Sequence, residues 1–201
     1  MRYSRTIRID GENDFLEAED AFETTANNYR AYAAWDDAYF YLAFEGDDIG
    51  SGDAFKSLLI YFDGESNETT TTGVDTNTQI PGLPFSAGYS FRWIANGTSN
   101  ALVVEGSTWT LDQDFDFSGS VFQNGRYIEF RFPFQKLGYP ARPEHIRMTA
   151  FMVNAAADAE WTYAIMPGAG LNREGYDADI TSFYEFQTRG RLVPAEHGPQ
   201  S

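Results

Sequence analysis

Three aromatic residues, Trp93, Trp161 and Tyr176, have sequence surroundings that could make them a binding surface. A flat apolar ring can stack on the C–H face of a sugar while nearby polar groups bond the sugar hydroxyls. Trp161 is flanked by acidic and aromatic residues, and Trp93 ends a run in which alternate positions are aromatic. Packing in the core is the alternative for each tryptophan, and for Trp35, which ends a strand-like run, we expect it.

Acidic residues gather at turns where they could bind a cation. Asp47, Asp48 and Asp53 surround a glycine-rich turn that exposes carbonyl groups, and Asp63 could join them if the next strand returns to the same edge. Calcium prefers six to eight oxygen ligands of these kinds. The sequence therefore predicts structural calcium at these four residues, and solvated acidic turns are the alternative. A second cluster with the same two readings consists of Asp112, Asp114 and Asp116.

Residues for catalysis are scarce. The chain has no cysteine and two histidines, and it contains no nucleophile elbow, phosphate-binding loop or zinc-protease motif. Paired carboxylates for glycoside hydrolysis cannot be identified among 30 acidic residues, because their separation is not encoded in sequence spacing. We expect a protein that is not an enzyme; a glycosidase-like or redox accessory domain is a third alternative.

The charge restricts the class of partner. With 30 acidic and 14 basic residues the formal net charge is −16, which repels polyanions. Nucleic acid is therefore not expected as a partner. No run of about 18 apolar residues occurs, so membrane insertion is not expected either. The first residues lack the apolar core of a signal peptide, so the chain is cytosolic or a signal has been removed.

The pattern along the chain is that of β-strands. Residues 38–45 place Phe40, Leu42 and Phe44 on one face, opposite a partner run at 29–35. Asn124 and Gly125 predict a type I′ turn before residues 126–132, in which Ile128, Phe130 and Phe132 face the core while Glu129 and Arg131 face out. Further strands are expected at 6–11, 55–62, 89–95, 101–105, 108–111, 146–154, 161–166 and 180–188.

These strands, with turn signals every 8–12 residues, predict an all-β fold. We expect a two-sheet antiparallel β-sandwich of immunoglobulin-like or jelly-roll-like type. Residues 65–87 are rich in threonine, glycine and proline and are expected to form a long loop, which in compact domains is usually functional or disordered. Residues 1–188 are expected to form a single domain, and residues 189–201 a C-terminal tail.

Four segments in order resemble the family 9 carbohydrate-binding module and its DOMON-like relatives. They are Ile9-Asp10-Gly11, the run from Ala34 to Phe44, the run from Gly52 to Asp63, and the run from Gly125 to Gly138. The resemblance covers roughly residues 6–188. It implies a β-sandwich that is often appended to secreted polysaccharide-active enzymes or surface proteins, and that commonly carries structural calcium.

Together these features predict a non-catalytic carbohydrate-binding-type module with structural calcium. Its expected partners are a polysaccharide or oligosaccharide and a catalytic or surface domain of the same parent protein. The expected location is extracellular, periplasmic or at the cell surface. The alternative is a structural or interaction domain without a small-molecule ligand.

Overall fold

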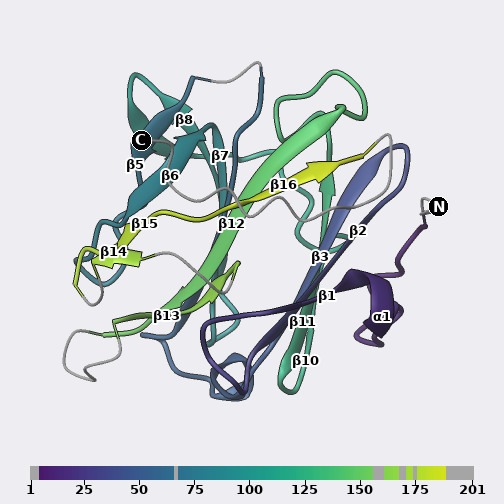
Figure 1. The fold of residues 1–201 in the computed structure, drawn as a ribbon, viewed down its shortest axis with the longest axis horizontal. Coiled ribbons are helices and arrows are strands. Elements are labelled where there is room, and N and C mark those ends of the chain that lie inside the picture. The colour runs from purple at the N-terminus through teal and green to yellow at the C-terminus, as the bar shows by residue number, and fades with distance from the viewer. Residues whose placement is uncertain (1–4, 66–67, 156–160, 168–170, 174–175, 189–201) are drawn as a thin grey trace.

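The computed structural model describes residues 5–65, 68–155, 161–167, 171–173 and 176–188, and the predicted tail, 189–201, lies outside them. The regular secondary structure of the described residues is almost entirely β-strand, with one four-residue helix, α1 (Glu17–Asp20), and a 3-10 turn, η1 (Asp47–Gly50). Two antiparallel sheets pack face to face, as Figure 1 shows, which confirms the predicted sandwich. None of the described helices is long and apolar enough to cross a membrane.

The first sheet, sheet A, has the strand order β1-β2-β3-β11-β10, and every neighbouring pair is antiparallel. Its two hairpins are those with the clearest alternation in the sequence. The strands are β1 (Ala21–Glu23), β2 (Arg30–Trp35), β3 (Tyr39–Glu45), β10 (Val121–Asn124) and β11 (Tyr127–Pro133).

The second sheet, sheet B, has the order β13-β12-β4-β7-β8-β9, and β12 pairs with β16 through its first residues. Every strand pair described in it is antiparallel. The strands are β4 (Ser57–Phe62), β7 (Tyr89–Ile94), β8 (Ser99–Glu105), β9 (Thr108–Leu111), β12 (His145–Val153), β13 (Thr162–Met166) and β16 (Tyr184–Gln187).

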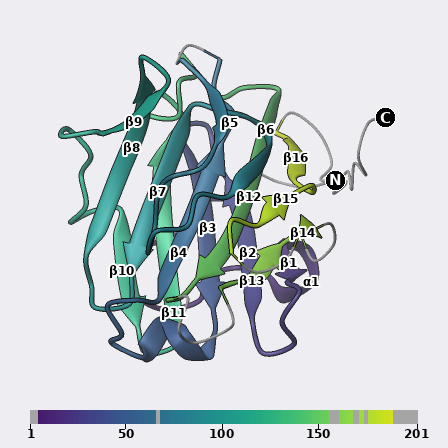
Figure 2. The same ribbon diagram turned by 90° about the vertical axis from the view of Figure 1, so that its left-hand side faces the viewer.

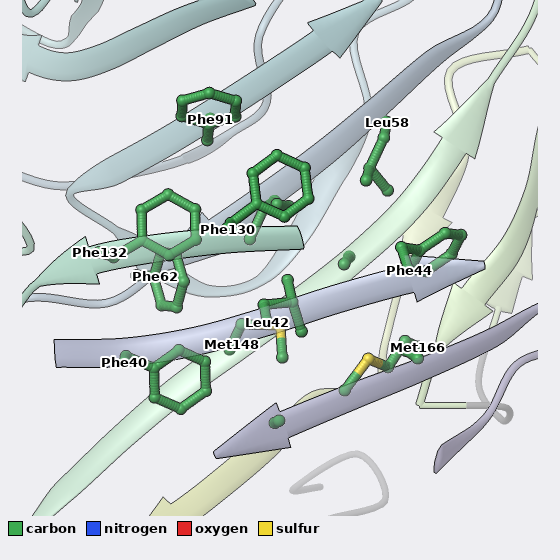
Figure 3. Packing of buried hydrophobic residues seen from close by; sticks show 14 of the residues in the cluster. Phe40, Leu42, Phe44, Leu58, Phe62, Phe91, Phe130, Phe132, Met148 and Met166 are labelled. Carbon is green, nitrogen blue, oxygen red and sulfur yellow. The ribbon is translucent and has the colours of Figure 1, made fainter. Parts of the chain in front are cut away.

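The main core lies between these two sheets and is rich in phenylalanine. Phe40, Leu42 and Phe44 of β3 are fully buried and face residues of sheet B such as Leu58 and Phe62, as Figure 3 shows. Aromatic rings meet across the layers: the ring centroids of Phe40 and Phe62 are 5.6 Å apart at 79°. The alternation predicted for β3 and β11 is confirmed, and Trp35 is a core residue with 5 % exposure.

A third, smaller sheet was not expected from the sequence. Sheet C has the order β14-β15-β6-β5 and packs on the face of sheet B that points away from sheet A, where Tyr61 and Phe151 meet Leu83 and Phe85. Figure 2 shows its strands grouped beside β12. They are β5 (Thr70–Thr72), β6 (Gly82–Ala87), β14 (Leu171–Arg173) and β15 (Asp179–Ile180), and β15 runs parallel to β6.

Two strands of sheet C fall inside residues 65–87, so the prediction of one long loop there is wrong. Threonine-rich β5 is mostly exposed and lacks the pattern of a core strand. In β6 the residues Leu83, Phe85 and Ala87 alternate as in a core strand, but a proline lies between the first two. The pairing of β6 with β15 joins segments almost a hundred residues apart. Such pairing depends on tertiary context more than on local propensity.

The N-terminal segment differs from its predicted strand. Residues 5–9 form no strand, and Ile7 instead inserts its side chain, 2 % exposed, against the outer face of sheet A. Glu129 of β11 lies under this segment and is fully buried, which corrects its predicted outward exposure. Its carboxylate Oε1 accepts hydrogen bonds from the backbone N–H groups of Asp10 and Gly11, both at 2.6 Å.

The type I′ turn lies at a different hairpin from the one predicted. Asn124 pairs with Tyr127, so the two loop residues are Gly125 and Arg126, and only Gly125 has positive φ (+58°). In the hairpin between β8 and β9 both loop residues, Gly106 and Ser107, have positive φ (+56° and +67°), as a type I′ turn requires.

Candidate functional site

One end of the sandwich collects the loops that hold the candidate residues. Ser57, at the start of β4, pairs with both Ile94 at the end of β7 and Val153 at the end of β12. Val153 in turn pairs with Thr162 at the start of β13. The turns after or before these residues therefore meet at one end, which is the lower part of the molecule in Figure 1 and is called the loop end.

Two of the three predicted aromatic residues meet at the loop end. The ring centroids of Trp161 and Tyr176 are 6.3 Å apart and their planes are at 85°, an edge-to-face contact. Tyr176 is 39 % exposed and Trp161 is partly exposed. The Tyr176 hydroxyl donates to the backbone oxygen of Thr78, and it lies 3.0 Å from the Thr78 hydroxyl oxygen. The name Trp161 corner is used here for Trp161, Tyr176, the loop at residues 76–80, and the residues bonded to them, Phe55, Asn154 and Asp177.

The loop of the Trp161 corner is held in an unusual backbone conformation. Thr76 and Gln79 exchange both backbone hydrogen bonds, 2.9 and 3.0 Å, which closes a tight four-residue turn. Inside it, Asn77 and Thr78 have φ of +54° and +63°, a region that β-branched residues rarely adopt. Asp177, at φ +50°, accepts the Ile80 N–H at 2.7 Å. Strained positions of this kind gather at binding sites more often than elsewhere.

Apolar side chains extend the exposed surface around this loop. Phe55 is 57 % exposed, and its backbone oxygen accepts a hydrogen bond of 2.7 Å from the Asn77 side-chain amide. Ile80 is 43 % exposed and lies in the loop itself. The Trp161 corner thus presents an aromatic pair beside hydrogen-bonding groups, an arrangement that suits a ligand with one apolar face and several hydroxyls.

Trp93 lies elsewhere. It belongs to β7, and two strands of sheet B separate β7 from β13, so Trp93 does not join Trp161 and Tyr176. It is 2 % exposed and packs in the main core. It also lines a groove of about 560 Å³ between the sheets, together with Phe117, which is 36 % exposed, and Gln123 and the serines Ser99 and Ser118.

The predicted calcium ligands are engaged with groups of the chain itself. Asp47 forms an ion pair with Arg126 at 2.9 Å and accepts from the Asn28 amide. Asp48 accepts the Tyr163 hydroxyl at 2.5 Å and lies 3.8 Å from the Lys56 ammonium. The Asp53 carboxylate accepts the Phe55 backbone N–H. Because Arg126 and Lys56 are both cationic, they disfavour the binding of a further cation at this turn.

Asp63 does not join these residues. Asp53 precedes β4 and Asp63 follows it, so the length of the strand, roughly 20 Å, separates them. Asp63 instead accepts hydrogen bonds from the Tyr139 hydroxyl and the Arg147 backbone N–H. Within the described ranges no three acidic or histidine side chains converge as metal ligands. The four predicted residues therefore do not fit a calcium ion.

The second acidic cluster is also dispersed among protein partners. Asp112 receives the Lys136 ammonium at 3.0 Å and the Tyr89 hydroxyl at 3.2 Å. Asp116 instead bonds the Ser118 hydroxyl and the Gly119 N–H within its own turn. The carboxylates of Asp112 and Asp116 thus bind different groups of the chain and do not converge on one ion.

Among the described residues two carboxyl groups have a raised pKa, which is often the mark of a general acid. Burial is the main cause for both Glu129 and Asp63. Each is held by hydrogen bonds from the chain itself: Glu129 by backbone N–H groups and the Tyr127 hydroxyl, and Asp63 as described above. Their environment is therefore structural, since their oxygens face the chain rather than a groove.

The sequence does not identify several residues of the Trp161 corner as candidates. Its pattern predicts Phe55 in a strand, and no motif marks Gln79 or Asn154. The one available signal was the length and threonine content of residues 65–87, which indicated a functional segment without identifying its residues.

Comparisons with known proteins add no family to this description. The chain matches no protein-family model, no curated protein and no solved structure. The resemblance to carbohydrate-binding modules stays a prediction.

Proposed function

We propose that this chain is a non-catalytic domain of carbohydrate-binding type that holds a neutral polysaccharide or oligosaccharide at the Trp161 corner. The observation that carries the proposal is the edge-to-face contact between Trp161 and Tyr176, which are distant from most of the loop residues in sequence but meet at one exposed site. Tyr176 is anchored by its hydroxyl to Thr78, so its ring is fixed before any ligand arrives. A ring held in this way binds with a smaller loss of side-chain entropy.

The charge of the chain supports a neutral ligand over an anionic one. The net charge is −16, and Asp177 lies in the corner itself. A phosphorylated or sulfated ligand would meet like charge there. A neutral sugar would meet apolar rings and hydrogen-bonding groups without that repulsion.

The structural role of the two carboxyls with a raised pKa supports binding over catalysis. Both are hydrogen-bonded within the chain; Glu129 lies on β11 of sheet A, and Asp63 follows β4 of sheet B. A glycosidase of the usual type would need two carboxyls flanking one bond of the sugar. The proposal therefore assigns no catalytic residue. It also omits calcium at the Asp47 turn, because the groups there do not fit the ion.

The test is retention of the protein on affinity gels that contain soluble neutral polysaccharides. Trp161→Ala and Tyr176→Ala should each weaken binding by about tenfold or more, equivalent to about 1.4 kcal/mol, because each removes stacking area. Trp161→Phe should restore part of the affinity. Leu111→Ala, at an apolar residue 53 % exposed on β9 and outside both the corner and the groove, is the control and should bind as the wild type does.

The opposite outcomes separate the alternatives. If the wild type is retained by none of the polysaccharides, the structural or interaction domain becomes the better description. If Phe117→Ala abolishes retention and Trp161→Ala does not, the groove lined by Trp93 is the binding site instead.

A further inference from the structure

Two buried amide oxygens at the Trp161 corner have no hydrogen-bond partner among the described residues. They are Oε1 of Gln79 and Oδ1 of Asn154, and both side chains are 1 % exposed. The two residues touch, since the Gln79 Nε2 donates to the Asn154 backbone oxygen at 2.6 Å. A buried carbonyl oxygen without a hydrogen bond is destabilising, and native proteins rarely contain one.

The backbone next to both side chains is linked to the aromatic pair. The Asn154 N–H donates to the Trp161 backbone oxygen at 3.0 Å. Gln79 follows Thr78, the residue that anchors the Tyr176 hydroxyl. The backbone of Asn154 is therefore bonded to Trp161, and Gln79 is the neighbour in sequence of the residue that anchors Tyr176.

The chemistry of the two groups restricts what can satisfy them. Amide oxygens only accept, so the missing partner is a hydrogen-bond donor or a cation. A cation is disfavoured because the Arg92 guanidinium already faces this loop, at 3.0 Å from the Asp75 backbone oxygen and 3.4 Å from the Thr76 hydroxyl. An anionic ligand would meet the like charge of Asp177 and of the chain as a whole. A neutral hydroxyl satisfies each condition.

We infer that Gln79 and Asn154 determine specificity at the Trp161 corner by accepting hydrogen bonds from hydroxyl groups of the bound sugar. The inference rests on the proposed function and deepens it. In the sugar-free protein an ordered water supplies the donor, and a sugar hydroxyl of the same chemistry displaces it. A buried acceptor left unpaired by a ligand that lacks the hydroxyl then discriminates against that ligand.

The experiment uses Asn154→Leu and Gln79→Met in the full chain, with titration calorimetry against the polysaccharide that the wild type retains. Each variant should lose about tenfold or more in affinity. Ser90→Ala is the control: its buried hydroxyl oxygen also lacks a partner, but it lies on β7 opposite Tyr61, and affinity should not change. A second measurement on the wild type uses oligosaccharides lacking one hydroxyl each, and at least one of them should bind about tenfold more weakly.

The outcomes distinguish this inference from the proposed function. If Trp161→Ala loses binding while Asn154→Leu and Gln79→Met bind normally but melt at lower temperature, a structural water alone uses the oxygens, and the inference is wrong while the function stands. If Asn154→Leu does not fold, the deoxygenated ligands decide, and equal binding of all of them overturns the inference. If the wild type binds no polysaccharide, the proposed function has failed, and the inference fails with it.

Discussion

At the scale of single residues, tertiary contacts decide whether a polar side chain is buried, and the local sequence pattern does not predict it. Glu129 alternates with core residues along β11, so its period of two predicts exposure. The N-terminal segment nevertheless covers it, and Oε1 accepts two backbone N–H groups. Nothing in the local sequence indicates this, because the contact joins residues more than a hundred positions apart.

Glu129 should make stability depend on pH. Burial raises its pKa above the ordinary value, so the folded state binds a proton more tightly than the unfolded state. The stability that protonated Glu129 contributes is fully present below the pKa of the unfolded state, 4.5, and is lost as the pH rises through the pKa of the folded state. Glu129→Gln keeps an acceptor and removes the ionisation, so it should gain stability relative to the wild type as the pH rises from 4 to 8, in urea unfolding.

Removing the acceptor altogether is the matched control for Glu129. Glu129→Leu leaves the N–H groups of Asp10 and Gly11 without their partner and should be less stable than Glu129→Gln by roughly 2–4 kcal/mol at every pH, because neither variant ionises at this position. If Glu129→Gln and Glu129→Leu lose the same amount, the hydrogen bonds to the N-terminal segment contribute nothing.

At the scale of elements, what could be predicted is what the chain encodes locally. The strands with strict alternation, β3 and β11, lie where the pattern placed them, and Phe40 and Phe130 are core residues. Sheet C was missed because its strands are two to six residues long and pair across large separations. The turn at Gly125 was displaced by one residue, since pairing register decides which two residues form the loop.

Substitutions in the two hairpin turns should change the stability of the fold in opposite directions. Gly125 has φ of +58°, and a Cβ atom at this position would have no described atom within 4 Å. Gly125→Ala should therefore lower stability by about 1 kcal/mol through backbone strain alone. Ser107 has φ of +67° and pays the strain that a glycine avoids, so Ser107→Gly should stabilise by roughly 0.5–1 kcal/mol. Thermal unfolding of the two variants measures both; changes of the same sign would contradict the assignment of the turns.

The candidate site shows the same division. The sequence identifies Trp161 and Tyr176 as candidate binding residues. Their contact depends on loops whose course no local pattern predicts. Trp93 has the same chemistry as Trp161, and only its position on the inner face of β7 places it in the core. Composition thus suggests which residues can bind, and tertiary structure decides which of them reach the surface.

At the scale of the whole molecule, the acidity should destabilise the fold through self-repulsion. With a net charge of −16, added salt screens this repulsion, and the melting temperature should rise by about 2–4 °C for each 1 kcal/mol of relief. Calcium and magnesium chloride at equal ionic strength should give equal shifts, because the Asp47 turn does not fit a calcium ion. A stabilisation specific to calcium and reversed by EDTA would contradict this.

The position of sheet B between two other layers has a consequence for how this chain diverges. All six residues of β4 are buried, because one face meets sheet A and the other meets sheet C. A substitution at any of them changes the volume of one core or the other. The strand therefore has little freedom to drift, whereas β10 and the loop at 76–80 have much more. Distant relatives would share an unbroken apolar run at β4 long after their ligand-contacting residues had changed.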